Sequence, residues 1–589
     1  MSLSRVALVA GGALLVLASL FIPPGWFIPL PRNTAPLPPP ISGFTLVQIT
    51  LFIEGLVLMW LGLRRWPQRE SSAAAGYLLP DVEPQPKSEP HLEPGPEPDL
   101  DPRLSLWLLA AISLLGLVLR IVSLGNDLWI DELTPVTAYR NASWMQVAVT
   151  YTSSNNHLLN TLLVNTSIRL FGQSEWAIRL PAMLWGTATI PALYWVARQA
   201  LSRYASLSAA LLLAVSYHHI FFSQNARGYS AYLFLSLVSS VLLVKALSTD
   251  RRRTWVAFVA TTLLNFAALL ISGFVFAAHV IVGGLAVLTI KGRGGPWRPL
   301  LQRLVWIFGL IAFLGFQMYA AVVPQMYMLM RSVYTESTSG FSLFSLELVA
   351  ELTRGLTAGF GTGLLLGAIP FLALAVAGYV ILVRRHWILA LALTLPCLLQ
   401  AVLIVVQGLT FSPRFFILAL PLAIMVVVQA LTSATSFVAR GLRQSDRFAW
   451  WCRTAGVVVL CVASIAALPR YYTVPKQPYR AALAFVETAR QPGSRVIVIH
   501  YASAGMRYYL ERTGTSDADY DVRVRTLEAL DTVMAEEPGR PVWLVTTFPR
   551  ALRLGVPDLD ARIKRDWEIV RTFPATIGDG QILVWRQKP

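Results

Sequence analysis

The side chains best suited to chemistry lie in a polar segment, residues 125–179, between two apolar stretches. Its ionisable groups include Asp127, Asp131, Glu132, His157, Glu175 and Arg179. A polar segment in this position is either a solvent loop or an active site at the boundary between water and lipid. The adjacent acids Asp131 and Glu132 follow the apolar run Leu128–Trp129–Ile130, and this arrangement favours the active site.

Asp131 has two interpretations. A short helix is predicted at 133–139, and acids in a first helical turn are stabilised by the helix dipole. Asp131 would then be only a helix cap, which contributes about 1 kcal/mol. A carboxylate held at the membrane surface can instead accept a proton from a hydroxyl nucleophile. Spacing alone does not separate the two interpretations.

His157 is a candidate for substrate binding. It precedes LLNTLLVNTSIRLFG, a predicted amphipathic helix that could lie in the membrane interface. A lone histidine in such a place is more often a hydrogen-bonded structural residue than a ligand. Its imidazole could also contact a phosphate or orient an acceptor.

Arginines at the predicted outer ends of membrane spans are further candidates for substrate binding. Arg227 lies in the turn FFSQNARGYSAY, together with Asn225 and Tyr229. Its side chain could reach toward lipid head groups or make a bidentate contact with a phosphate. Arg414, in the turn TFSPRFF, has the same alternatives. Arg179 is a weaker candidate.

The sequence does not indicate metal or nucleic-acid binding. Its three cysteines all lie inside apolar runs, and there is no CxxC pair. His218 and His219 have no acid or cysteine at ligand spacing, so a divalent metal is possible but unsupported, and no cofactor is expected to be required. The 49 Lys+Arg exceed the 32 Asp+Glu. However, no soluble basic stripe with interleaved aromatic residues occurs, so nucleic acid is not an expected partner.

Membrane helices must position these groups. Of 589 residues, 55% are hydrophobic and 14% are charged, whereas soluble domains carry about 25% charged residues. A span needs about 20 apolar residues, and on this basis we predict a multispan α-helical membrane protein. The predicted spans number thirteen, near residues 5–22, 44–63, 105–124, 178–197, 205–222, 230–247, 255–271, 273–290, 304–324, 358–383, 387–406, 413–434 and 449–467.

The basic residues predict the orientation. They gather in alternate short loops, as in Arg251–Arg253 and Arg384–Arg385, and such loops stay on the cytoplasmic side. We therefore expect a cytoplasmic N-terminus in a bacterial-type plasma membrane, with membrane lipids as neighbours. Loops 125–177 and 325–357 and the C-terminal segment are then extracytoplasmic. Loop 325–357 is long enough to act as a flap over a site.

Composition divides the chain into four parts. Residues 1–65 are predicted to form a two-span membrane attachment, and 66–103 an acidic, Pro-rich, disordered cytoplasmic linker. Residues 104–470 form the transmembrane core. Residues 471–589 alternate strand and helix patterns and predict a small extracytoplasmic α/β domain with a mostly parallel sheet.

Several motifs occur in the order seen in a known family. They are WIDE after the first core span, an HxLL-type segment, LFGQSEWAIRLPAML, YHHIFFSQNARGYS and SPRFFILALPLA. In this respect the chain resembles glycosyltransferase family 39, the dolichyl-phosphate-mannose–protein mannosyltransferase group. That family belongs to the C-type (GT-C) superfamily, together with the lipid A aminoarabinose transferases. The resemblance covers residues 105 to about 470.

The resemblance implies an integral-membrane glycosyltransferase that moves a sugar from a polyprenyl-phosphate donor to an acceptor outside the cytoplasm. The acceptor would be a lipid, glycan or protein. Asp131 matches the catalytic carboxylate, with Glu132 as its motif neighbour, and Arg227 matches a basic residue that holds the donor phosphate. Direct displacement would invert the anomeric centre.

The chain also departs from the family pattern. The family commonly has HPPL where this chain has His157–Leu158–Leu159, and a glutamate where Asn225 stands. A transporter or flippase for a lipid-linked sugar is the alternative function, although no paired repeat with broken helices is evident. A membrane anchor for a partner-binding C-terminal domain is a third possibility.

Overall fold

The computed structural model describes residues 3–27, 42–63, 100–153, 155–336, 365–406, 413–514, 519–522 and 524–588. Most of the predicted linker 66–103 and of loop 325–357 lies outside these residues. Contacts divide the chain into two compact units. The helical unit comprises 1–119, 142–163 and 182–464, and the sheet unit comprises 120–141, 164–181 and 465–589. The domain boundaries drawn from composition remain predictions.

The protein is an integral membrane protein. Among the described residues, seven helical segments are long and apolar enough to cross a membrane. They are α3 (Pro102–Ile121), α10 (Tyr229–Thr249), α12 (Ser272–Gly292), α13 (Trp297–Tyr319), Ala375–Val406 of α16 (Leu365–Val406), α17 (Ala419–Gly441), and Asp446–Thr473, which contains α18 (Asp446–Ala466) and α19 (Leu468–Thr473). The bent pair α8 (Arg203–Val215) and α9 (Tyr217–Ser223), with an angle of 60°, makes an eighth if it is one span.

The predicted count of thirteen spans is only partly supported. Helices also form at other predicted positions but are not among the seven: α1 (Leu3–Phe21), α2 (Gly43–Leu63), α7 (Glu175–Ala197) and α11 (Arg252–Ala268). The spans predicted at 358–383 and 387–406 correspond to two helices that meet at a kink within α16. Its backbone leaves helical geometry at His386, with φ −138° and ψ 48°. Arg384 and Arg385 therefore lie directly before the kink at which the two helices meet.

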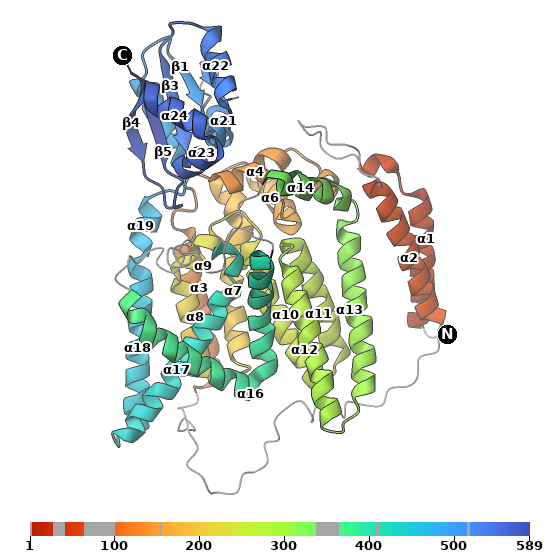
Figure 1. The fold of residues 1–589 in the computed structure, drawn as a ribbon. Coiled ribbons are helices and arrows are strands. Elements are labelled where there is room, and N and C mark those ends of the chain that lie inside the picture. Colours follow the sequence, from red (N-terminus) through yellow and green to blue (C-terminus); the bar gives the residue numbers. More distant parts are fainter. Residues whose placement is uncertain are drawn as a thin grey trace. The chain divides into compact units, whose positions relative to one another are not determined.

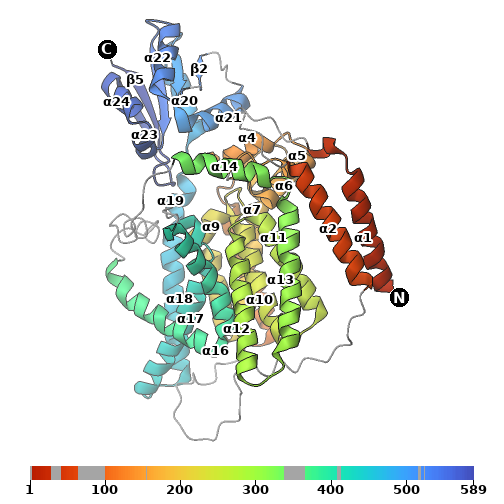
Figure 2. The same ribbon diagram turned by 45° about the vertical axis from the view of Figure 1, so that its right-hand side comes forward.

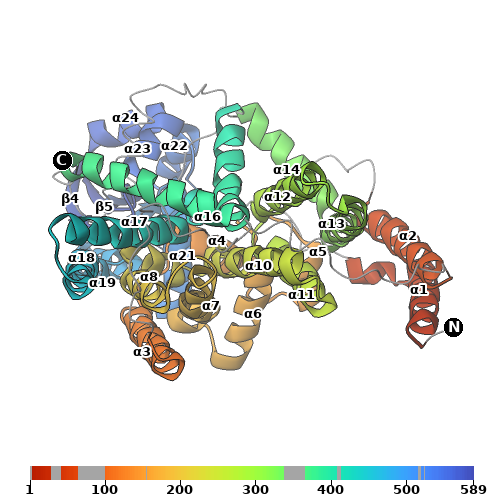
Figure 3. The same ribbon diagram turned by 90° about the horizontal axis from the view of Figure 1, so that it is seen from below.

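Close helix packing characterises the helical unit. Helices α10 to α13 lie as neighbours, with α16 against α10 and α12 (Figure 3). α10 buries Ser236, Ser239 and Ser240, small residues that allow neighbouring helices to approach closely. The remaining helices are η1 (Pro24–Phe27), α5 (Trp144–Val149), α6 (Leu158–Phe171), α14 (Val323–Glu336) and η4 (Pro413–Phe416).

The sheet unit contains a five-stranded sheet in the order β2-β1-β3-β5-β4 (Figure 1). Its strands are β1 (Arg495–Val498), β2 (Tyr520–Asp521), β3 (Val542–Thr547), β4 (Trp567–Phe573) and β5 (Ile582–Gln587). β1 pairs in parallel with β2 and β3, whereas β5 is antiparallel to both β3 and β4. The expectation of a mostly parallel sheet is therefore wrong. The closing pair of strands β4 and β5 forms as predicted, but β5 returns beside β3 in the opposite direction.

Helices cover both faces of this sheet, as Figure 2 shows. They are α20 (Tyr479–Ala489), η5 (His500–Ala502), α21 (Ser503–Thr513), α22 (Leu527–Glu536), α23 (Pro549–Gly555) and α24 (Pro557–Asp566). α22 and α24 pack on the face formed by Ile497 and Leu544. α20 packs against β5 and α21. The same unit includes the acid-bearing segment with its helix α4 (Ile130–Tyr139), which packs against α21.

Candidate active site

Asp131 and Glu132 lie in the first turn of α4, where the sequence placed a helix start. The side chains have different environments, because Glu132 is fully buried and Asp131 is half-buried. Glu132 Oε2 accepts the backbone N–H of Trp129 at 3.2 Å. This bond makes Glu132 the acid that caps the helix end. It leaves Asp131 on the solvent-accessible side of the pair.

Arg179 is the main partner of Glu132. The guanidinium donates from Nε to Oε1 at 2.9 Å and from Nη2 to Oε2 at 2.7 Å. It also donates to the carbonyls of the preceding loop, from Nη1 to Leu124 and Asn126 and from Nη2 to Asp127. An arginine has five N–H donors, and these five bonds use all of them. Arg179 therefore fixes the backbone of the loop that precedes Asp131 and Glu132.

Lys476 completes this buried cluster, although its sequence context gave no indication of a site. Its Nζ lies 3.8 Å from Glu132 Oε1, and its side chain is only 5% exposed. Burial lowers the pKa of Lys476 to about 7; the carboxylate of Glu132 opposes this shift and the guanidinium of Arg179 adds to it.

The C-terminal part of the chain also holds the loop before Asp131. The backbone N–H of Arg480 donates to Asp127 Oδ2 at 2.8 Å, and the Arg480 guanidinium binds Oδ1 of the same carboxylate. Gln477 Oε1 accepts the N–H of Ile130 at 2.8 Å, and the Tyr509 hydroxyl accepts that of Leu128 at 2.8 Å. None of these partners was predicted, because each lies more than 300 residues away along the chain.

A second cluster of predicted residues forms within the helical unit, around His157 and Arg227. Both side chains are buried. The backbone N–H of Gly228 donates to His157 Nδ1 at 2.8 Å. Burial lowers the pKa of His157 well below its ordinary value, and the positive charges of Arg227 and Arg414 lower it further. A neutral imidazole that accepts at Nδ1 carries its proton on Nε2.

The Nε2–H of His157 lies beside an arginine donor. Arg227 Nη2 is 3.4 Å from His157 Nε2 and donates to Asn155 Oδ1 at 2.8 Å. The Arg227 guanidinium also lies over the Tyr229 ring, 5.1 Å from its centroid. A guanidinium beside an imidazole N–H can bind an anionic oxygen such as that of a phosphate.

The turn that carries Arg227 is held tightly. Asn160 donates to the carbonyl of Ala226 at 2.9 Å, and the N–H of Arg227 donates to the carbonyl of Asn225 at 2.6 Å. A Cβ atom on Gly228 would lie 2.0 Å from the carbonyl oxygen of Ala268, so only glycine fits there. Of the predicted substrate-binding residues, His157, Asn225, Arg227 and Tyr229 thus lie together in this cluster.

Arg414 belongs to the same unit and acts on His157 through its charge. Arg179 belongs to the sheet unit with Asp131 and Glu132. The expectation that Asp131 and Arg227 line the same pocket stays a prediction. Within the described ranges, no group of three or more His, Cys, Asp or Glu could hold a metal ion.

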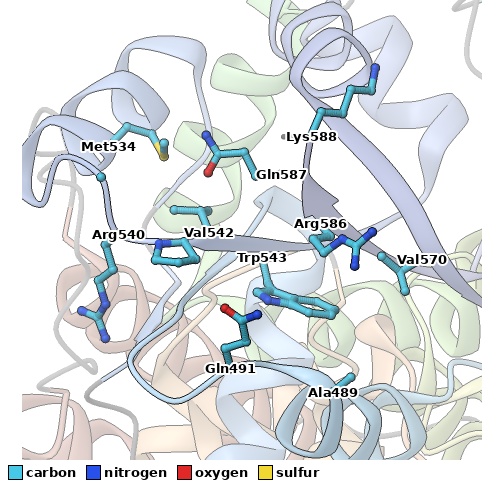
Figure 4. Close-up of a pocket in the computed structure, with 12 residues that line it drawn as sticks. Ala489, Gln491, Met534, Arg540, Val542, Trp543, Val570, Arg586, Gln587 and Lys588 are labelled. Atoms are coloured by element: carbon cyan, nitrogen blue, oxygen red, sulfur yellow. The ribbon is translucent and has the colours of Figure 1, made fainter.

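A separate groove of about 560 Å³ lies on the sheet unit, beside Trp543 of β3 (Figure 4). Three cations line it, and each already has a protein partner. Arg540 binds Glu537, and Arg586 binds Glu568. Lys588 donates to two backbone carbonyls. Because these charges are already compensated, we assign no ligand to the groove.

Three solved structures are similar to this chain. ArnT from Cupriavidus metallidurans, bound to undecaprenyl phosphate, is 15% identical, with a TM-score of 0.48 over 82% of this chain and 98% of that one. The Archaeoglobus fulgidus oligosaccharyltransferase in its apo form is 12% identical, with a TM-score of 0.46 over 77% and 70%. Arabinosyltransferase EmbB from Mycobacterium smegmatis is 14% identical, with a TM-score of 0.38 over 75% and 46%.

No curated protein matches the chain. A family model does match residues 158–321, and its description is dolichyl-phosphate-mannose-protein mannosyltransferase. The matched segment contains Arg227 and its turn and begins directly after His157. Since the TM-scores of the solved structures are below 0.5, the identification depends on this match. The resemblance to glycosyltransferase family 39 that the motifs indicate is thereby confirmed for residues 158–321, the segment that carries Asn225, Arg227 and Tyr229.

Proposed function

We propose that the protein is an integral-membrane glycosyltransferase that uses a polyprenyl-phosphate-linked sugar. The observation that carries this proposal is the pair of donors formed by Arg227 and the neutral His157, because it suits the phosphate of a lipid-linked donor. The match of residues 158–321 to a mannosyltransferase family supports the same reaction class. The acceptor is a lipid, glycan or protein on the extracytoplasmic face, and the C-terminal α/β region lies on that face.

In the proposed reaction Asp131 is the general base. Its carboxylate takes the proton of an acceptor hydroxyl as the hydroxyl oxygen attacks the anomeric carbon of the donor sugar. The bond from that carbon to the phosphate oxygen breaks, and polyprenyl phosphate leaves with the electron pair. Attack from the face opposite to the leaving group inverts the anomeric centre. Arg227 and the Nε2–H of His157 stabilise the charge that develops on the phosphate.

Glu132 and Arg179 have positioning roles in this proposal. Glu132 is fully buried and bonded to a guanidinium whose five donors are all used, so neither group is free to take a proton or bind a phosphate. Together they fix the loop from Leu124 to Asp127 and the start of α4. A base held in this way needs little reorganisation when the substrate binds.

The test is Asp131→Asn in the purified protein, supplied with a radiolabelled polyprenyl-phosphate sugar and an envelope fraction as acceptor. Sugar transfer should fall by at least about a hundredfold, because the amide cannot take the proton, while the donor still binds. Asp558→Asn is the matched control, since Asp558 is an exposed acid in the first turn of α24. Full transfer by Asp131→Asn would refute the assignment. Movement of the donor across vesicles without a glycosidic product would instead identify a flippase.

A further inference from the structure

The two central parallel strands of the sheet end in strained residues. His500 follows β1 with φ 47°, and Phe548 directly follows β3 with φ 53°. A non-glycine residue rarely adopts this conformation, although asparagine, aspartate and histidine do so more often than other types, so Phe548 is the more unusual of the two. Residues that do so cluster at active sites and ligand clamps. Both residues are aromatic, and both stand at the carboxyl edge of the sheet.

The strained residues form one aromatic cluster with Tyr501. The ring centroids of His500 and Tyr501 are 3.9 Å apart, and those of Tyr501 and Phe548 are 5.9 Å apart. The N–H of His500 donates to the carbonyl of Val524 at 2.8 Å, and α23 begins at Pro549, next to Phe548. The backbone thus holds the rings in place. Tyr501 is 36% exposed, so a ligand can reach its ring.

This edge is connected to the segment that bears Asp131. Gln477 accepts the N–H of Ile130 through Oε1 and donates through Nε2 to Thr547 Oγ1 at 3.1 Å. Ile130 precedes Asp131, and Thr547 precedes Phe548. One buried amide therefore bonds to the residue before Asp131 and to the residue before Phe548. In open α/β sheets, ligands bind outside the carboxyl ends of parallel strands.

We propose that the exposed ring of Tyr501, supported by His500 and Phe548, is a platform that binds a sugar ring at the carboxyl edge of the sheet. A sugar ring presents C–H groups on its faces, which suit an aromatic surface, and its hydroxyls can be bound by the polar groups around it. The inference rests on the proposed glycosyl transfer and specifies part of its binding site. The ring belongs either to the acceptor glycan or to the sugar of the donor, and the two sources require different measurements.

The test compares Tyr501→Ala with the wild-type protein in nanodiscs, and Tyr501→Phe as a control that keeps the ring. An array of bacterial surface glycans measures binding of free glycans. Hydrolysis of a radiolabelled polyprenyl-phosphate sugar, with water in place of the acceptor, measures the KM for the donor. We expect Tyr501→Ala to weaken one of these by about tenfold or more, and Tyr501→Phe to weaken neither. Thermal unfolding of each variant checks that it is folded.

Loss of glycan binding assigns the platform to the acceptor, and a raised KM in hydrolysis assigns it to the donor sugar. The platform would be refuted if folded Tyr501→Ala kept both its glycan binding and its donor KM unchanged. It would also be refuted if the wild-type protein bound no glycan and its donor KM did not depend on Tyr501. The proposed transfer fails separately, because a wild-type protein that neither hydrolyses the donor nor transfers its sugar would refute that function.

Discussion

Replacement of Glu132 by glutamine should destabilise the sheet unit far more than an ordinary loss of an ion pair. The substitution keeps the shape of the side chain and removes a charge that receives two donors of Arg179, at 2.9 and 2.7 Å. Both side chains are at most 2% exposed, so the guanidinium would stay buried without its counterion. Such a change costs about 3–5 kcal/mol. In a unit of this size that lowers Tm by about 6–20 °C.

Glu511→Gln is the matched control. It removes the same charge from an ion pair with Arg140, with a 2.6 Å contact but with side chains 22% and 47% exposed, and an exposed pair contributes about 0–1 kcal/mol. The assay is thermal unfolding of the purified variants in nanodiscs, followed by intrinsic fluorescence. Equal Tm values for the two variants would refute the reasoning. A normal Tm with lost sugar transfer would instead make Glu132 a catalytic group.

Two further predictions concern the cations. The pKa of Lys476 is about 7 in the fold against an ordinary 10.5. Between these two pH values the unfolded chain therefore binds more protons than the folded chain. The free energy of unfolding should rise with pH across this window, by at most about 1.4 kcal/mol per pH unit. Denaturation at several pH values should show a smaller rise in Lys476→Met, and parallel curves would contradict the burial argument. Arg227→Lys should raise the donor KM about tenfold or more, since an ammonium cannot reproduce the contacts of the planar guanidinium. Exposed Arg293→Lys should leave the KM unchanged, and equal values for the two variants would remove Arg227 from the donor site.

Local patterns predicted much of the fold. Strand and helix signals gave the elements of the C-terminal region, including the pair β4 and β5, because each depends on a few neighbouring residues. The direction of β5 beside β3 could not be predicted, since it depends on where the chain returns. The thirteen predicted spans are only partly supported, because hydropathy finds apolar stretches but does not show which of the helices they form cross the membrane.

The candidate site could likewise be predicted only in part from local sequence. The residue types and the motif turn were enough to select His157 and Arg227, which do lie together. The roles of Glu132 and Arg179 were not readable, because they depend on a contact between residues 47 positions apart. Lys476, Gln477 and Arg480 gave no local signal, since their partners come from the far end of the sequence.

The contact of Asp127 with Arg480 spans 353 residues, and this separation has a consequence for biosynthesis. Ribosomes add about 5–20 residues per second, so the acid-bearing loop leaves the ribosome roughly 20–70 seconds before the segment that holds it in place. During this interval the loop that carries Asp127 would lack the contact with Arg480 that holds it. We therefore expect this loop to become ordered only when translation is nearly complete, and a chain truncated before residue 480 to lack this support.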